Sequence, residues 1–146
     1  MFPALLLALA PMPAPPAADV PTVHGHTSST PAEVAAYVAA GTASLVDVRE
    51  ADEWDDGHLA AASLVPLSDL KARAEDPAFA AALAEKLPKD KPVFTHCKSG
   101  GRCVLAAEPL RKLGYDVRPM KEGYVDLLED GYAPASDAAG TARTAG

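Results

Sequence analysis

Short apolar runs alternate with segments of helical pattern through the middle of the chain. Four runs of apolar and β-branched residues predict buried strands at residues 44–48, 63–66, 92–96 and 115–120. Helical segments are predicted at residues 30–40, 49–58, 77–87, 101–113 and 124–129. Because strands that alternate with helices pair in parallel through right-handed crossovers, the pattern predicts a three-layer α/β domain.

Several of these elements carry their own start and stop signals. Thr30 with Glu33 three residues later forms a capping box, and Pro31 occupies the first helical position. Asp76 is a suitable N-cap for the helix that follows it. Pro109 lies inside the helix predicted at residues 101–113, so we expect a kink or an interruption there.

The N-terminus differs from this middle part. Residues 1–10 form an uncharged apolar run followed by a Pro- and Ala-rich stretch, so we predict a signal peptide at residues 1–18 and a periplasmic or secreted protein. No Lys or Arg precedes the run, and the alternative is a disordered extension of a cytoplasmic protein. The run is too short for stable membrane insertion, which takes about 20 apolar residues.

Composition sets the other boundaries and the class of partner. Residues 19–29 predict a polar linker, residues 30–133 the folded domain, and residues 134–146 a disordered tail. The net charge of −7 argues against nucleic acid as a partner, since phosphate binding needs a concentrated basic face. A small anion remains a suitable partner, because a local cluster of N–H groups and cations binds it even in an acidic protein.

The chemistry is concentrated in one segment, THCKSGGRC at residues 95–103. Cys97 follows a predicted strand and precedes a predicted helix, where the N–H groups of a Gly-rich loop form an anion-binding nest. Such groups lower the pKa of a thiol from about 8.5 to roughly 3.5–7.5, which makes Cys97 the candidate nucleophile. The candidate substrate-binding residues are Lys98, Ser99, Gly100, Gly101 and Arg102. Arg102 is expected to act as a bidentate clamp on oxyanion oxygens.

The second cysteine, Cys103, has two interpretations. It lies six positions after Cys97 and is either a small apolar residue at the start of the helix or a resolving thiol that forms a disulfide with Cys97. Two cysteines are too few for a disulfide scaffold and lack the partners of a zinc site, so no metal and no cofactor are expected.

Other polar residues are assigned to structure. His96 adjoins the nucleophile, but neighbouring residues of a strand point to opposite sides, so we expect a packing role. Asp47, Arg49 and His58 are expected to form a buried polar network at the end of the first strand. Trp54 is expected to anchor an otherwise solvated acidic helix face.

Five segments follow one another in a recognisable order and spacing. They are LVDVRE at 45–50, Gly57 with His58, VPL at 65–67, CKSGGR at 97–102 and LGYDV at 113–117. Together they resemble the rhodanese homology domain over about residues 30–132. The family commonly has Pro and Gly where Ala60 to Ala62 stand, and Gly-Gly with Trp where Glu122, Gly123 and Tyr124 stand.

The resemblance implies a five-stranded parallel sheet flanked by helices and a thiosulfate sulfurtransferase. In that chemistry Cys97 takes a sulfur atom from a small anionic donor such as thiosulfate as a persulfide and passes it to a thiophilic acceptor, cyanide or a thiol. The four residues between Cys97 and Arg102 favour this family over related phosphatases, whose loop is one residue longer. A thiol-reducing protein is a further candidate partner. The alternative functions are a thiol oxidoreductase using Cys97 and Cys103, and a non-catalytic rhodanese-like binding module.

Overall fold

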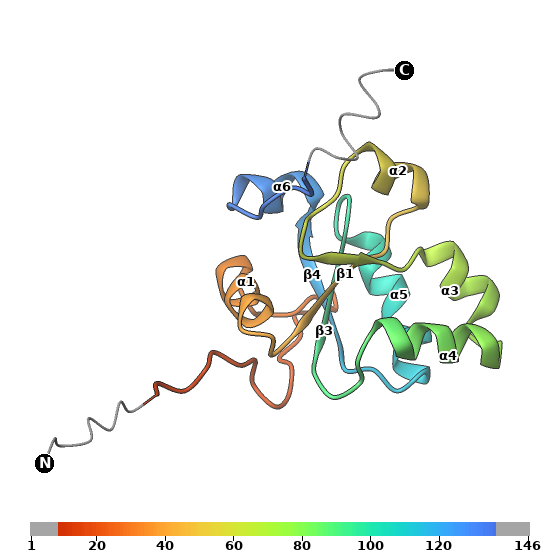
Figure 1. Cartoon of the computed structure of the whole chain (residues 1–146), viewed down its shortest axis with the longest axis horizontal. Coiled ribbons are helices and arrows are strands. Elements are labelled where there is room, and N and C mark those ends of the chain that lie inside the picture. The colour runs from red at the N-terminus through yellow and green to blue at the C-terminus, as the bar shows by residue number, and fades with distance from the viewer. Residues whose placement is uncertain (1–8, 137–146) are drawn as a thin grey trace, which may run out of the picture.

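The computed structural model describes residues 9–136, so the expectations for residues 1–8 and 137–146 lie outside the described part (Figure 1). The strands are β1 (Ser44–Asp47), β2 (Ala62–Leu64), β3 (Val93–Cys97) and β4 (Val117–Gly123). The helices are α1 (Pro31–Ala39), α2 (Ala51–Asp56), α3 (Leu67–Arg73), α4 (Pro77–Lys86), α5 (Gly101–Lys112) and α6 (Tyr124–Glu129). Each strand overlaps the apolar run that predicted it.

The strands form one parallel sheet in the order β2-β1-β3-β4. The three-layer α/β prediction is confirmed, but the prediction of five strands is wrong for residues 9–136, whose sheet has four. Beside the outer edge of β4, the chain folds back on itself through an antiparallel bridge between Pro21 and Thr27. Thr27 N–H donates to Pro119 C=O at 2.6 Å. Pro119 itself has no N–H with which to extend a ladder along this edge.

Helices cover both faces of the sheet (Figure 1). α1 and α6 lie on one face, where Val34, Phe94 and Leu127 belong to one hydrophobic cluster. α3, α4 and α5 lie on the other face, where a second cluster includes Leu70 and Leu110. β3 is buried along its whole length between them. A one-residue slip would exchange its two faces, so this burial fixes the position of its last residue.

Hydrogen bonds decide two of the helix predictions. Thr30 Oγ1 accepts from Glu33 N–H at 3.2 Å and the Glu33 carboxylate accepts from Thr30 N–H at 2.8 Å, which confirms the capping box. α5 continues past Pro109, so the predicted interruption is wrong. Pro109 lacks only the N–H that would bond the Leu105 carbonyl, so α5 loses one hydrogen bond and continues.

α3 was not predicted. It begins after Pro66 without a side-chain cap and ends without a glycine, whereas Gly57 and Gly131 mark the ends of the similarly short α2 and α6.

The predicted linker, residues 19–29, lies against the folded domain. Thr27 is 7% exposed, and its hydroxyl donates to the Asp19 carboxylate at 2.6 Å. Earlier in the chain, the Thr42 hydroxyl donates to Pro13 C=O at 2.6 Å. At the C-terminal end, where the tail was predicted to begin, Ala135 N–H donates to a backbone carbonyl at 2.8 Å. Within residues 9–136, no helix combines the length and apolar character needed to span a bilayer.

Candidate active site

The carboxyl end of β3 passes into α5 through a short loop that carries the candidate nucleophile. Cys97 is the last residue of β3, and α5 begins at Gly101. Gly100 caps α5 in the left-handed region, with a φ of 87°. Lys98 and Ser99 are exposed whereas Cys97 is 1% exposed, so the sulfur lies at the base of the loop, inside its exposed rim.

The groups around the Cys97 sulfur favour its ionised form. Gly100 N–H donates to Cys97 Sγ at 3.1 Å. The Cys103 thiol, followed by the backbone N–H groups of Cys103, Ser99 and Gly100, lowers the pKa of Cys97 to about 4, although burial acts in the opposite direction. Cys97 is therefore a thiolate at neutral pH, which is the nucleophilic form of this side chain.

Two glycines allow the loop to close on β4. A Cβ added to Gly100 would lie 2.7 Å from the carbonyl oxygen of Lys121, in a backbone conformation that other L residues avoid. A Cβ added to Gly123, at the end of β4, would overlap the carbonyl oxygen of Lys98. Gly101 differs, since a Cβ there meets nothing within 4 Å. The close approach of β4 to the loop therefore depends on Gly100 and Gly123.

Cys103 lies in the first turn of α5 and has different surroundings. It is fully buried, and its Sγ lies 3.0 Å from the carbonyl oxygens of both Gly100 and Met120. A carbonyl oxygen only accepts hydrogen bonds, so it favours the neutral thiol, which can donate one. The adjacent Cys97 side chain, together with burial, raises the pKa of Cys103. Cys103 is therefore a protonated thiol and a poor nucleophile at neutral pH.

Arg102, the expected anion clamp, pairs with Glu53 of α2. Its Nη1 and Nη2 donate to Glu53 Oε1 and Oε2 at 2.5 and 2.8 Å. The hydrogen bond from Arg102 lowers the pKa of Glu53 to about 2, so both groups are charged at neutral pH. The two side chains are 30% and 29% exposed. An anion that enters the loop therefore competes with a carboxylate for this guanidinium.

Two residues beside the loop were not identified from the sequence. Glu53 belongs to the acidic helix that was assigned to a solvated face. His26, from the predicted linker, places its Nε2 2.7 Å from the carbonyl oxygen of Gly100. Their partners lie 49 and 74 positions away along the chain, so no local pattern marks either residue.

The buried polar network at the end of β1 consists mainly of one ion pair. Arg49 Nη2 lies 2.7 Å from Asp47 Oδ2, with both side chains buried, and also donates to the carbonyl oxygen of Gly57 at 2.8 Å. The pair agrees with the expected network, and it joins β1 to the end of α2. His58 was expected in the same network, but its ring stacks on Trp54 instead, at a centroid distance of 3.6 Å.

His96 is a buried neighbour of Cys97 and is not placed as a base. Its side chain is fully buried, with Nε2 3.8 Å from Asp47 Oδ2. Burial lowers the pKa of His96, so its ring is neutral at neutral pH. A neutral ring at this depth has a packing role, as expected from its place on the strand.

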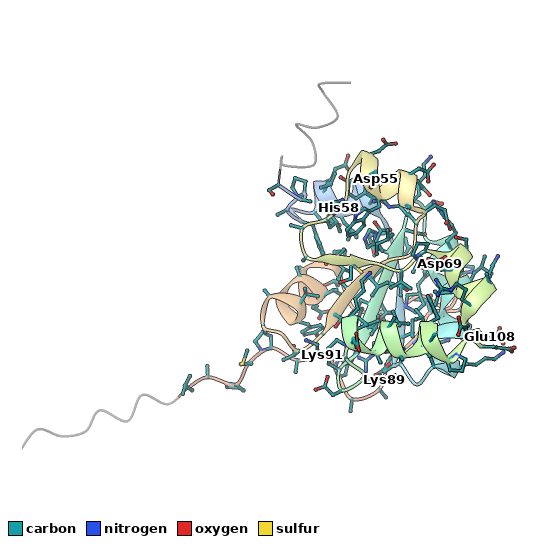
Figure 2. The ribbon with its side chains drawn as sticks, turned by 45° about the vertical axis from the view of Figure 1, so that its right-hand side comes forward. Asp55, His58, Asp69, Lys89, Lys91 and Glu108 are labelled. Atoms are coloured by element: carbon teal, nitrogen blue, oxygen red, sulfur yellow. The ribbon has the colours of Figure 1, made fainter. Side chains whose placement is uncertain are left out.

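The loop lies at the carboxyl end of the sheet. Figure 2 shows Asp55 and His58, at and just after the end of α2, at the opposite end of the domain from Lys89 and Lys91, which precede β3. Parallel α/β sheets bind their ligands beyond the carboxyl ends of the strands. Among residues 9–136, no three His, Cys, Asp or Glu side chains are grouped so that they hold a metal ion.

Known proteins share this fold and this arrangement of segments. A model of the rhodanese-like domain family matches residues 30–130 of the chain. The chain is 36% identical to the uncharacterized protein YqhL of Bacillus subtilis over 83 residues, which are 56% of this chain and 58% of YqhL, less than two thirds of that relative. It is 34% identical to the thiosulfate:glutathione sulfurtransferase of Homo sapiens over 102 residues, which are 66% of this chain and 89% of that relative.

This chain is also similar to a solved structure. The rhodanese-related protein from Thermoplasma volcanium matches with a TM-score of 0.57 and 25% sequence identity, over 74% of this chain and 96% of that one. The parallel sheet with helices on both faces is therefore shared by the two proteins.

Proposed function

Because this chain belongs to the rhodanese-like domain family, we propose that it is a sulfurtransferase in which Cys97 carries a sulfane sulfur as a persulfide. The observation that carries the proposal is the Gly100 N–H directed at Cys97 Sγ. It belongs to a loop that holds the pKa of Cys97 at about 4. An ionised sulfur at the base of a cup of N–H groups is suited to attack a small anionic sulfur donor.

The first half of the reaction loads the enzyme. The Cys97 thiolate attacks the outer sulfur of thiosulfate, and a new bond forms between Sγ and that sulfur. The sulfur–sulfur bond of thiosulfate breaks, and its electron pair leaves with sulfite. No oxidant or reductant is needed, because one sulfur–sulfur bond replaces another.

The second half returns the enzyme to its starting state. An acceptor thiolate or cyanide attacks the outer sulfur of the persulfide, and Cys97 leaves as a thiolate. The low pKa of Cys97, about 4, makes it a good leaving group in this step. We propose a low-molecular-weight thiol as the acceptor, by analogy with the thiosulfate:glutathione sulfurtransferase of Homo sapiens.

The oxygens of the donor are held by the rim of the loop. Lys98 and Ser99 are exposed there and offer a cation and a hydroxyl. Arg102 supplies the bidentate cation, but its two outer nitrogens already bind Glu53. The donor therefore shares or displaces that carboxylate, so Glu53 sets how strongly Arg102 binds the donor.

A thiol oxidoreductase is the second candidate, and Cys103 argues against it. A resolving thiol must attack the sulfur of Cys97 as a thiolate. Cys103 instead faces the carbonyl oxygens of Gly100 and Met120, and its pKa is raised. These surroundings favour Cys103 as a hydrogen-bond donor within the loop over a redox partner of Cys97.

The test is the intact mass of the full chain after incubation with thiosulfate. We expect a gain of about 32 Da on Cys97, as covalent sulfur transfer requires, and its removal when cyanide or glutathione is added. Cys97→Ser should lose both the mass gain and the release of sulfite. Cys103→Ser is the matched control, and it should still gain the sulfur. A chain that alkylates at Cys97 yet never gains sulfur would contradict the proposal.

A further inference from the structure

We propose that His26 is a positioning residue of the reactive loop, where its ring N–H holds the carbonyl of Gly100 and thereby the N–H of Gly100 that contacts Cys97. His26 lies outside residues 30–130, the part that the family model matches. The inference goes beyond the proposed sulfur transfer, since it concerns the thiolate before any donor arrives.

The segment that carries His26 is folded tightly. Thr22 N–H donates to His26 C=O at 2.7 Å, and Ser28 N–H donates to Val20 C=O at 3.1 Å. Gly25, with a φ of 82°, makes the turn between them. The backbone of His26 is therefore fixed by a closed set of local hydrogen bonds, and its side chain leaves a defined position.

The same segment is attached to the domain on both sides of His26. Before it, a Cβ on Gly25 would lie 3.5 Å from a methyl group of Val104, so Gly25 packs on α5. After it, Thr27 N–H donates to Pro119 C=O at 2.6 Å at the edge of β4. The residues on either side of His26 are thus attached to α5 and to β4.

The contact has one chemically consistent assignment. His26 Nε2 lies 2.7 Å from the carbonyl oxygen of Gly100, and a carbonyl oxygen only accepts. Nε2 therefore carries the hydrogen and donates the hydrogen bond. Cys103 Sγ lies 3.0 Å from the same oxygen, while Gly100 N–H donates to Cys97 Sγ at 3.1 Å. Hydrogen bonds to its carbonyl oxygen and from its N–H therefore hold Gly100 in a left-handed conformation, with the N–H facing Cys97 Sγ.

Loss of the His26 donor removes one of the two hydrogen bonds on the Gly100 carbonyl. The loop then spends more time in conformations in which Gly100 N–H does not reach Cys97, so the thiolate is less stabilised. A net hydrogen bond of ordinary strength changes such a balance by about three- to tenfold. The effect should appear in the ionisation of Cys97 rather than in the folding of the domain.

The experiment compares His26→Ala, His26→Gln and His24→Ala in the full chain. The rate at which iodoacetamide modifies Cys97 is measured across pH, together with thermal unfolding. In His26→Ala the acid limb of the profile should move to higher pH, with a rate about three- to tenfold lower at pH values well below the wild-type midpoint. His26→Gln should restore the wild-type profile, because its amide N–H reaches the same carbonyl. His24 is exposed in the same segment and is the matched control.

Each outcome bears on the inference. A profile unchanged in His26→Ala would overturn it, as would an equal shift in His26→Ala and His26→Gln or in His24→Ala. The readout does not depend on sulfur transfer. A chain that never gains sulfur from thiosulfate but shows the His26 effect refutes the proposed function alone, and the reverse result refutes this inference alone.

Discussion

The surroundings of Cys97 and Cys103 contrast sharply, although the two residues are six positions apart on one loop and helix. The backbone presents N–H groups to the sulfur of Cys97 and carbonyl oxygens to the sulfur of Cys103. The pKa of Cys97 is lowered to about 4, and that of Cys103 is raised. The same side chain is therefore an anion in one place and a neutral donor in the other.

Gly100 connects these two environments. Its N–H donates to Cys97, and its carbonyl oxygen accepts from Cys103. The Cys103 thiol and backbone N–H groups lower the pKa of Cys97, whereas the Cys97 side chain and burial raise that of Cys103, so a few neighbouring groups separate the reactivities of the two thiols.

The largest expected effect is the selectivity of alkylation. In the native chain at pH 6, iodoacetamide should modify Cys97 more than about 100 times faster than Cys103, since only the thiolate reacts. Peptide mass mapping at short reaction times measures the ratio. In guanidinium chloride both residues lose their backbone partners, and the ratio should fall to near one. Equal rates in the native chain would remove the contrast altogether.

The second prediction concerns Gly100, whose backbone contacts both cysteines. Gly100→Ala should lower sulfite release by about 10- to 100-fold and destabilise the fold by about 1–3 kcal/mol, because the added Cβ is strained at this φ and meets Lys121 O at 2.7 Å. The matched variant Gly101→Ala adds a Cβ that meets nothing within 4 Å, so it should destabilise far less. Comparable losses of stability in urea unfolding would contradict this explanation.

The third prediction concerns removal of the Cys103 thiol. Cys103→Ala should raise the pKa of Cys97 by about one unit, because the thiol that most lowers it is gone. The thiolate fraction then falls at pH 4 to 5 and is unchanged at pH 8, so the activity relative to wild type should recover as pH rises. Titration of the thiolate absorbance measures the shift. Cys103→Ser keeps a donor and should shift less, and a larger shift in Ser than in Ala would be inconsistent.

The smallest predicted effect concerns Arg102, the candidate anion clamp. Glu53→Gln releases Arg102 from a charged partner, so KM for thiosulfate should fall by about two- to fivefold with little change in kcat. Steady-state assays at low salt give the two constants separately. Asp52→Asn, on the same helix and exposed, is the charge-matched control. An equal fall in KM for both variants would point to general charge repulsion instead.

Local features of the fold were predictable because their causes are local. The apolar runs at β1 and β3, the capping box of Thr30 and Glu33, and the Gly-rich turn after Cys97 each depend on neighbouring residues alone. The strand count did not come from the pattern. It came from the family resemblance, and the edge of β4 in this chain has Pro119 where a fifth strand would need a donor.

The contacts that tune the site were not predictable for the opposite reason. Arg102 meets Glu53 and Gly100 meets His26 only after the sheet and helices have assembled, since 49 and 74 residues separate the partners. The two carbonyl oxygens facing Cys103 come from the loop and from β4, which are likewise joined only in the folded chain. Sequence patterns identified Cys97 as the candidate nucleophile, whereas its ionisation depends on tertiary packing.

The burial of Cys97 has a consequence for the proposed persulfide. A bond to a second sulfur is about 2 Å long, so the outer atom of that persulfide would lie about 2 Å from Cys97 Sγ. Because Cys97 is only 1% exposed, we expect that the Cys97 residues of two copies of the chain do not reach one another. The domain should therefore resist the formation of intermolecular disulfides in air, while small, narrow molecules can still enter the loop.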